Sequence, residues 1–157
     1  MASALQNLSN YDEKSVPSGK GKKIGIAVAE WNRHITFSLL TGCVDTLKQF
    51  EVQEEDIEIS IVPGTFELPY AAKQLYGQNM NAVICIGCVI KGETDHDIYI
   101  NNSVANALQN LNIQYNIPFI FGVLTPNNEQ QALDRAGGKH GNKGTEAAIT
   151  ALKMMQV

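Results

Sequence analysis

The chain has 157 residues, of which 44% are hydrophobic, and its formal net charge is -4 at pH 7. This length suits one compact domain, and the charge excludes the diffuse basic surface that concentrates proteins on nucleic acid. The chain has neither the run of roughly 20 apolar residues that a membrane-spanning helix needs nor, in residues 1–23, the apolar core of a signal peptide. We therefore expect a cytoplasmic protein that binds neither nucleic acid nor a membrane.

The hydrophobic pattern divides the chain into an arm and one domain. Residues 1–22 are polar and lack periodicity, which predicts an N-terminal arm outside the core. Over 23–157, short apolar runs alternate with stretches of helical spacing. The predicted strands are 24–29, 57–62, 82–89 and 119–124, and the predicted helices are 34–50, 68–76, 97–114, 128–136 and 144–156. This order predicts a three-layer α/β/α sandwich of the flavodoxin-like type, with a four-stranded parallel sheet that binds ligands at its carboxyl ends.

The loops after the first two strands each offer an aromatic ring. Trp31, the only tryptophan in the chain, follows the first strand. It either stacks on a heterocyclic ligand or packs over the sheet edge. Phe66 and Glu67 follow the second strand, and Glu67 either compensates a helix dipole or recognises a ligand hydroxyl. These two loops leave both alternatives open.

The loop after the third strand combines Gly92, Glu93 and Thr94 with His96 at a predicted helix start. Backbone N–H groups at a helix start bind anions. Histidine is a common proton carrier in enzymes, although many surface histidines at helix starts have no function. The loop is therefore a candidate anion site.

A glycine-rich segment near the C-terminus concentrates positive charge in an otherwise acidic chain. Arg135, Lys139, His140 and Lys143 lie within or next to residues 137–144. They form either a second phosphate site or a glycine-based helix stop whose cations compensate the helix dipole. The segment is not a P-loop, because Gly144 follows Lys143 where that motif needs Ser or Thr.

The cysteines give no sign of a metal or redox site. Cys43, Cys85 and Cys88 lie in apolar runs, where free cysteine behaves as a small buried hydrophobe, and their odd number fits a reducing compartment. Cys85 and Cys88 have C-x-x-C spacing, but in a strand they face opposite sides. We expect neither a metal nor an organic cofactor.

Five ordered segments together resemble the lumazine synthase family along nearly the whole chain from Lys23 onward. The segments are residues 29–32, 62–69, 87–96, 121–125 and 135–144. The resemblance implies a transferase of riboflavin biosynthesis that condenses 5-amino-6-(D-ribitylamino)uracil with 3,4-dihydroxy-2-butanone 4-phosphate. The products would be 6,7-dimethyl-8-ribityllumazine, inorganic phosphate and water.

The resemblance also implies a role for each site residue. The catalytic pair would be His96, as proton carrier, and Arg135, as the cation for the phosphate. Trp31 would stack on the pyrimidine ring, and the ribityl chain would be bound by Asn32, Thr65, Phe66 and Glu67. The edge of the ring would be bordered by Cys88, Val89 and Ile90. The phosphate would be bound by Gly92, Glu93 and Thr94. Cys88 stands where related sequences often have Thr, and Glu93 where a small residue is common, which leaves their fine contacts open.

Part of this site would come from a neighbouring subunit. In the family the active site lies between subunits, so the neighbour would supply Phe121, Asp134, Arg135, Lys139 and Lys143. The resemblance implies a homopentamer, which in some members assembles into an icosahedral capsid, and it allows an association with riboflavin synthase.

Two alternatives belong to other functional classes. A flavin-binding electron carrier has the same fold class, but residues 30–33 lack the hydroxyl- and glycine-rich phosphate loop that such carriers place after the first strand. A chiefly structural shell protein is the other alternative, and assembly of this kind is compatible with catalysis.

Overall fold

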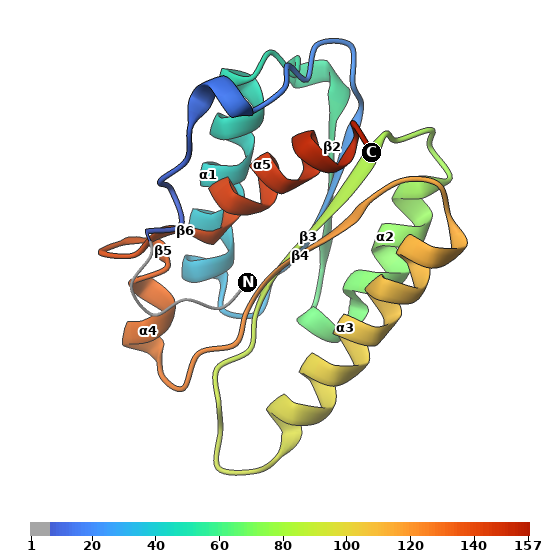
Figure 1. Ribbon diagram of the computed structural model, residues 1–157. Coiled ribbons are helices and arrows are strands. Elements are labelled where there is room, and N and C mark those ends of the chain that lie inside the picture. The colour runs from blue at the N-terminus through green and yellow to red at the C-terminus, as the bar shows by residue number, and fades with distance from the viewer. Residues whose placement is uncertain (1–6) are drawn as a thin grey trace.

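A four-stranded parallel sheet forms the centre of the molecule. The computed structural model describes residues 7–157, so the first part of the predicted arm lies outside the described residues. The strands are β1 (Ile24–Ala29), β2 (Ile57–Val62), β3 (Ala82–Cys88) and β4 (Phe119–Leu124). Their order is β2-β1-β3-β4, and every neighbouring pair is parallel (Figure 1). The predicted sheet is confirmed.

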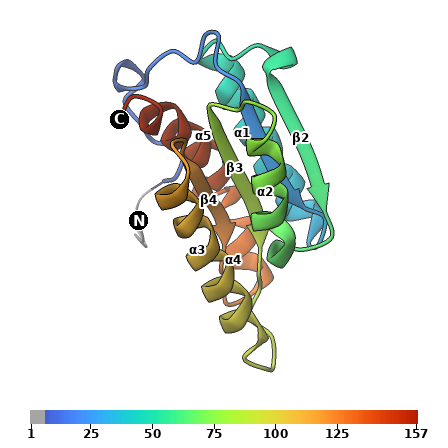
Figure 2. The ribbon, with the colours of Figure 1, turned by 90° about the vertical axis from the view of Figure 1, so that its right-hand side faces the viewer.

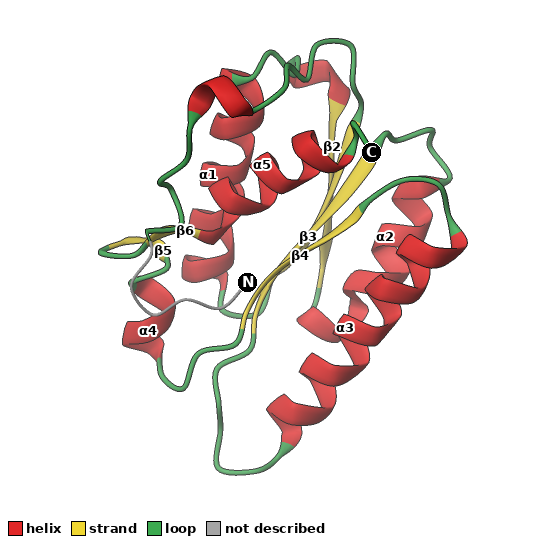
Figure 3. Ribbon diagram, in the orientation of Figure 1, coloured by secondary structure: helices red, strands yellow, loops and turns green. Residues whose placement is uncertain are grey.

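Helices cover both faces of this sheet. α1 (Arg33–Gln49) and α5 (Lys143–Met154) lie on one face, and α2 (Leu68–Tyr76) and α3 (His96–Gln114) lie on the other (Figures 1 and 3). Alternate strand residues supply the two cores: Ile26 and Val28 pack under α1 and α5, whereas Ala27 and Ala29 pack under α2 and α3. The predicted three-layer sandwich is confirmed. No helix among residues 7–157 is long and apolar enough to span a membrane.

The three cysteines are buried and free. Cys85 belongs to the core under α2 and α3, whereas Cys88 belongs to the core under α1 and α5, which confirms that this pair faces opposite sides. Burial raises the pKa of Cys85 and of Cys88 to about 12. Residues 7–157 contain no group of three or more His, Cys, Asp or Glu side chains placed to hold a metal ion.

The backbones of α1 and α5 approach closely at Gly144. A Cβ atom on this residue would lie 1.8 Å from the carbonyl oxygen of Leu39. Only glycine fits such an approach. This contact fixes α5 against α1.

The segment before α5 differs from the prediction. A helix was expected over 128–136, but α4 spans only Glu129–Leu133, and β5 (Ala136–Gly138) and β6 (Gly141–Asn142) then form an antiparallel hairpin. Ala136 is extended and pairs with Asn142, and the positive φ of Gly137 and Gly141, 107° and 80°, lets the chain fold back into this pairing in place of a helix. The expected extent of this helix was therefore wrong.

The described part of the N-terminal arm contacts the domain more closely than its composition suggests. Three short 3-10 turns, Glu13–Ser15, Glu54–Asp56 and Thr65–Glu67, complete the fold, and the first lies in the arm. Val16, next to this turn, is only 8% exposed and belongs to the core under α1 and α5. A lone apolar residue in a polar segment has no periodicity that would reveal its burial.

Candidate active site

A pocket of about 750 Å³ lies at the carboxyl ends of β1, β2 and β3. Figure 2 shows α2 and α3 in front of the sheet, with the start of α3 extending beyond the strands. The pocket brings together most of the predicted substrate-binding residues from three separate loops. They are Trp31, Asn32, Thr65, Phe66, Glu67, Cys88, Val89, Ile90, Gly92, Thr94 and His96.

The first loop presents the tryptophan ring to solvent and is tied to both neighbouring loops. The Trp31 side chain is 72% exposed, so it does not pack over the sheet edge. The Trp31 N–H donates to the carbonyl of Pro63 at 3.0 Å. Asn32 has left-handed backbone angles, φ 58° and ψ 44°, and its Nδ2 donates to the carbonyl of Cys88 at 3.0 Å. These two hydrogen bonds join the carboxyl ends of β1, β2 and β3.

The second loop combines a buried anchor with an exposed ring. Thr65 is buried against β3, where a Cβ on Gly87 would lie 2.7 Å from the Thr65 hydroxyl oxygen. Phe66, next along the chain, is 59% exposed. Glu67 precedes α2 without making a side-chain cap hydrogen bond, so its carboxylate stays available for a ligand hydroxyl.

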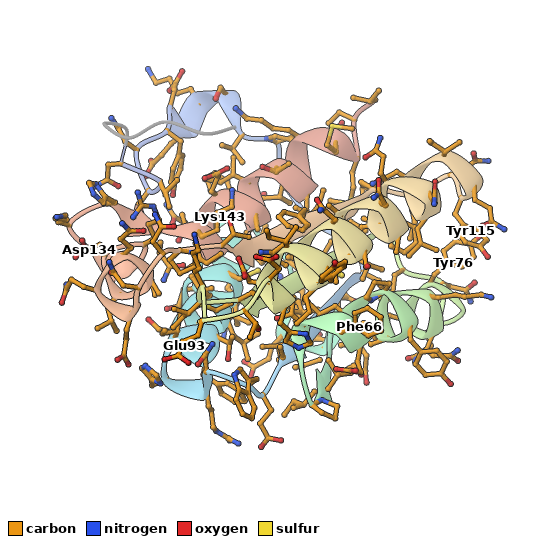
Figure 4. The ribbon with its side chains drawn as sticks, turned by 90° about the horizontal axis from the view of Figure 1, so that it is seen from below. Phe66, Tyr76, Glu93, Tyr115, Asp134 and Lys143 are labelled. Atoms are coloured by element: carbon orange, nitrogen blue, oxygen red, sulfur yellow. The ribbon has the colours of Figure 1, made fainter. Side chains whose placement is uncertain are left out.

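The third loop leads into α3, which begins at His96. The backbone N–H groups of Gly92, Glu93 and Thr94, in the loop before this helix, have no hydrogen-bond acceptor within residues 7–157, so they are free to bind an anion. Gly92 and Thr94 line the pocket, whereas the Glu93 side chain is not part of its wall (Figure 4).

The pocket wall also contains residues that were not predicted. Pro63 and Gly64 come from the second loop, and Asp97, Tyr99 and Ile100 from the first turns of α3. One carboxylate oxygen of Asp97 is buried and has no partner among the described residues. The α3 residues follow from helical geometry, because positions three and four after His96 lie on a neighbouring part of the same face.

Electrostatically, this pocket is incomplete for a phosphate ester. Its lining includes the carboxylates of Glu67 and Asp97 but no Lys or Arg among the residues that the structure describes. Backbone amides, the Thr94 hydroxyl and the His96 ring are the groups that could bind an anion here, and the two carboxylates repel it. A phosphate bound here needs a cation from elsewhere.

The expected cations lie on a separate surface, the cationic hairpin, which we define as residues 134–143. Lys139 pairs with Asp134 at 3.1 Å, and Arg135 donates from Nη1 to the carbonyl of Gln131 at 3.1 Å. Hydrogen bonds from Gln130 and then from Lys139 lower the pKa of Asp134. Figure 4 looks onto the carboxyl ends of the strands and shows Asp134 well away from Phe66.

Phe121 and Lys143 line a second cleft of about 710 Å³, along the free edge of β4 between α3 and α5. Phe121 is 37% exposed, and Lys143 pairs with Glu146 at 2.7 Å. Within one chain, the structure therefore does not bring any of the five residues expected from a neighbouring subunit into the strand-end pocket.

Comparison with known proteins identifies the family. The model of the 6,7-dimethyl-8-ribityllumazine synthase family matches residues 21–157. Proteins of that name from Porphyromonas gingivalis and Parabacteroides distasonis are 55% and 51% identical, covering 98% and 99% of this chain and 96% and 98% of the relatives. One from Flavobacterium johnsoniae is 49% identical over 100% of this chain and 83% of its own length. The chain belongs to the 6,7-dimethyl-8-ribityllumazine synthase family.

Proposed function

We propose that this chain condenses 5-amino-6-(D-ribitylamino)uracil with 3,4-dihydroxy-2-butanone 4-phosphate in a site that two copies of the chain share. Membership of the family makes the chain a transferase of riboflavin biosynthesis that forms 6,7-dimethyl-8-ribityllumazine, phosphate and water. It also removes the support for a flavin-binding electron carrier, which rested on the fold class alone.

The pyrimidine substrate suits the strand-end pocket of one copy. The exposed rings of Trp31 and Phe66 offer flat faces for stacking on a planar heterocycle. The Glu67 carboxylate accepts hydrogen bonds from the ribityl hydroxyls, and Cys88, Val89 and Ile90 border the ring. These positions support the roles that the family resemblance implies.

The observation that carries the shared site is that the pocket lining has no Lys or Arg within residues 7–157. The sugar phosphate brings one to two negative charges, which the helix start at His96 only partly compensates. Arg135 and Lys139 of a second copy would complete the phosphate site, because an Arg fork matches phosphate geometry. Phe121, Asp134 and Lys143 would approach with the same neighbour.

The reaction needs orientation more than a strong catalyst. The 5-amino group attacks the ketone carbonyl, water leaves to give an imine, and phosphate is then eliminated. Tautomerisation of the resulting enol exposes a carbonyl, on which the ribitylamino nitrogen closes the ring with loss of a second water. Proximity of two bound reactants contributes up to roughly 7–11 kcal/mol. His96 moves protons during these steps, and Arg135 neutralises the departing phosphate.

A shared site requires an oligomer, and we include in the proposal a cytoplasmic homopentamer able to assemble into an icosahedral shell and to associate with riboflavin synthase. A head-to-tail ring gives every pocket one neighbour of the same kind. The three buried free cysteines fit a reducing compartment.

The activity is tested by mixing both substrates with the protein and following the rise of lumazine absorbance, with a light-scattering mass from the same sample. An inert capsid that forms no lumazine would instead support the chiefly structural alternative. Full activity in single subunits would contradict the shared site.

A complementation experiment tests the shared site directly. His96→Ala and Arg135→Ala chains are unfolded together in equal amounts and refolded as mixed oligomers. Random mixing leaves about a quarter of the sites with both an intact pocket and an intact neighbouring arginine, so activity should recover. Each variant refolded alone is the control. Mixed samples no more active than these controls would show that His96 and Arg135 act within one chain.

A further inference from the structure

We infer that Ser38, on α1, is a positioning residue that orients the cationic hairpin for phosphate binding. Ser38 lines neither the strand-end pocket nor the β4 cleft, so no direct contact with substrate is implied. The inference rests on the proposed function, which assigns Arg135 and Lys139 of the hairpin to the sugar phosphate.

Ser38 is bonded to both strands of the hairpin. Its Oγ donates to the carbonyl of Ala136 at 2.5 Å, and its own carbonyl accepts from Nδ2 of Asn142 at 3.0 Å. Ala136 and Asn142 are partners in the β5–β6 pair, and Ala136 directly follows Arg135. One residue of α1 thus fixes the base of the hairpin beside the proposed phosphate-binding arginine.

Bonds inside the hairpin hold its two sides together but do not orient it. The N–H of Lys143 donates to the carbonyl of Arg135 at 2.9 Å, and that of His140 donates to the carbonyl of Asp134 at 2.8 Å. Both bonds would survive a rigid rotation of the hairpin away from α1. Orientation therefore depends on contacts with the rest of the chain.

The other contacts of this region lie at the base of the hairpin, are screened by solvent or come from the arm. At the base, Asn142 Oδ1 accepts from the Gly144 N–H at 2.8 Å, which joins the hairpin to α5. His34 pairs with Glu129 of α4 at 2.8 Å, but both side chains are more than half exposed, where solvent screens such pairs. From the arm, the Leu8 N–H donates to the His140 carbonyl at 2.7 Å, and Ser9 accepts from the Asn142 N–H. Ser38 anchors the hairpin to an element of the core.

Apolar packing cannot replace this anchor. Between Asp134 and Gly141, only Ala136 is a buried apolar side chain, and three of the other residues are glycines. Small errors in the placement of a binding group weaken the interactions that depend on its geometry, and a bidentate guanidinium–phosphate contact is strongly directional.

Steady-state kinetics tests the inference with three variants. Ser38→Ala should raise the KM for the sugar phosphate about fivefold to tenfold, the effect of one lost hydrogen bond on placement, and leave the KM for the pyrimidine unchanged. Ser38→Thr keeps the hydroxyl and should restore the wild-type value. Thr41→Val is the matched control, because Thr41 lies on the same helix and donates only to Phe37 of that helix.

Hydrogen exchange gives a readout independent of the proposed function. The amides of Leu8 and Asn142 donate hydrogen bonds that join the hairpin to the arm, and a reoriented hairpin breaks them. They should exchange faster in Ser38→Ala than in wild type or Thr41→Val, even if wild-type protein forms no lumazine. Unchanged exchange and KM would overturn the inference. An equal rise of both KM values together with a lower melting temperature would also overturn it, since that pattern indicates a purely structural role.

Discussion

The strand-end pocket and the cationic hairpin are held by different interactions. The first and third pocket loops follow β1 and β3, whose residues are all buried, and hydrogen bonds such as that from Asn32 Nδ2 to the Cys88 carbonyl join the loops. The hairpin instead depends on polar contacts, from Ser38 and from the Asp134–Lys139 pair. Burial of apolar strands is insensitive to salt and pH, whereas an ion pair with one exposed partner, here Lys139, is weakened by salt and by protonation of the carboxylate.

The two regions therefore offer different kinds of groups to a substrate. The pocket supplies rings, amides and carboxylates, while Arg135 and Lys139 lie outside it on the glycine-rich hairpin, where the Lys139 side chain is 67% exposed. In the proposed shared site, a second copy brings these cations to the substrate. A cation kept in water avoids the desolvation penalty that a buried, unpaired charge carries. Mutations should therefore affect substrate shape recognition and phosphate recognition separately.

The largest expected effect comes from Gly144→Ala, which disrupts the packing of α5 against α1. The new Cβ would lie 1.8 Å from the Leu39 carbonyl oxygen, and neither backbone can move without separating α1 from α5. We expect the free energy of unfolding to fall by more than about 3 kcal/mol, measured by urea denaturation. Gly92→Ala, where the added Cβ would meet nothing within 4 Å, is the control, and equal stabilities of the two variants would refute the packing argument.

Arg135→Ala should damage phosphate recognition while sparing the pocket. Loss of a charge-assisted contact should raise the KM for the sugar phosphate about 10- to 100-fold. Binding of the pyrimidine should stay unchanged when followed by the fluorescence of Trp31, the only tryptophan. Lys48→Ala, which removes a surface ion pair with Glu54, is the control. Unchanged turnover at limiting sugar phosphate would remove Arg135 from its proposed role.

The hydrophobic pattern predicted the sheet well: β1 and β3 are buried on both faces and β4 at every position except Phe121, whereas β2, at the sheet edge, alternates Ile with polar residues over most of its length. The predicted bounds of β1, β2 and β4 agree with the structure, and β3 ends at Cys88, one residue before the predicted end. The position of the site at the strand ends followed from the same topology. Pocket residues such as Tyr99 were missed because the prediction considered the loop that ends at His96 and did not follow the same face into the first turns of α3.

The hairpin could not be predicted in the same way. β5 and β6 have three and two residues, too few for a period of two, and Gly137 and Gly141 only indicate that a helix stops. The hairpin is bonded through Ala136 and Asn142 to Ser38 of α1, which lies 98 residues before Ala136. Such pairings have no signal in a single sequence.

Asn32→Ala should destabilise the loops of the strand-end pocket and leave the cationic hairpin unchanged. The substitution removes the hydrogen bond to the Cys88 carbonyl and puts alanine at φ 58°, a conformation that favours Gly and Asn. The free energy of unfolding should fall by about 1–3 kcal/mol. Asn32→Gly also loses the hydrogen bond but tolerates the left-handed backbone, so its free energy of unfolding should fall less. If the glycine variant is as unstable as the alanine variant, the left-handed backbone contributes nothing.

The smallest effect should appear in the acid stability of the hairpin. Hydrogen bonds from Gln130 and Lys139 hold the pKa of Asp134 below its ordinary value of 3.8. The ionised carboxylate therefore stabilises the folded chain above that value, and the contribution disappears as the pH falls through the lower, folded-state pKa. The difference in urea midpoint between wild type and Asp134→Asn should accordingly narrow from pH 6 toward pH 3 and below.

Comparison with a second carboxylate separates this effect from general acid unfolding. Glu55→Gln changes an exposed acid that forms no ion pair within residues 7–157, so its midpoint should follow wild type over the same range. Because the two substitutions remove equal charge, only the local contacts of Asp134 can make their pH dependences differ. A constant gap between wild type and Asp134→Asn would mean that the Asp134–Lys139 pair does not stabilise the hairpin, and Ser38 would then be its principal polar anchor to the core.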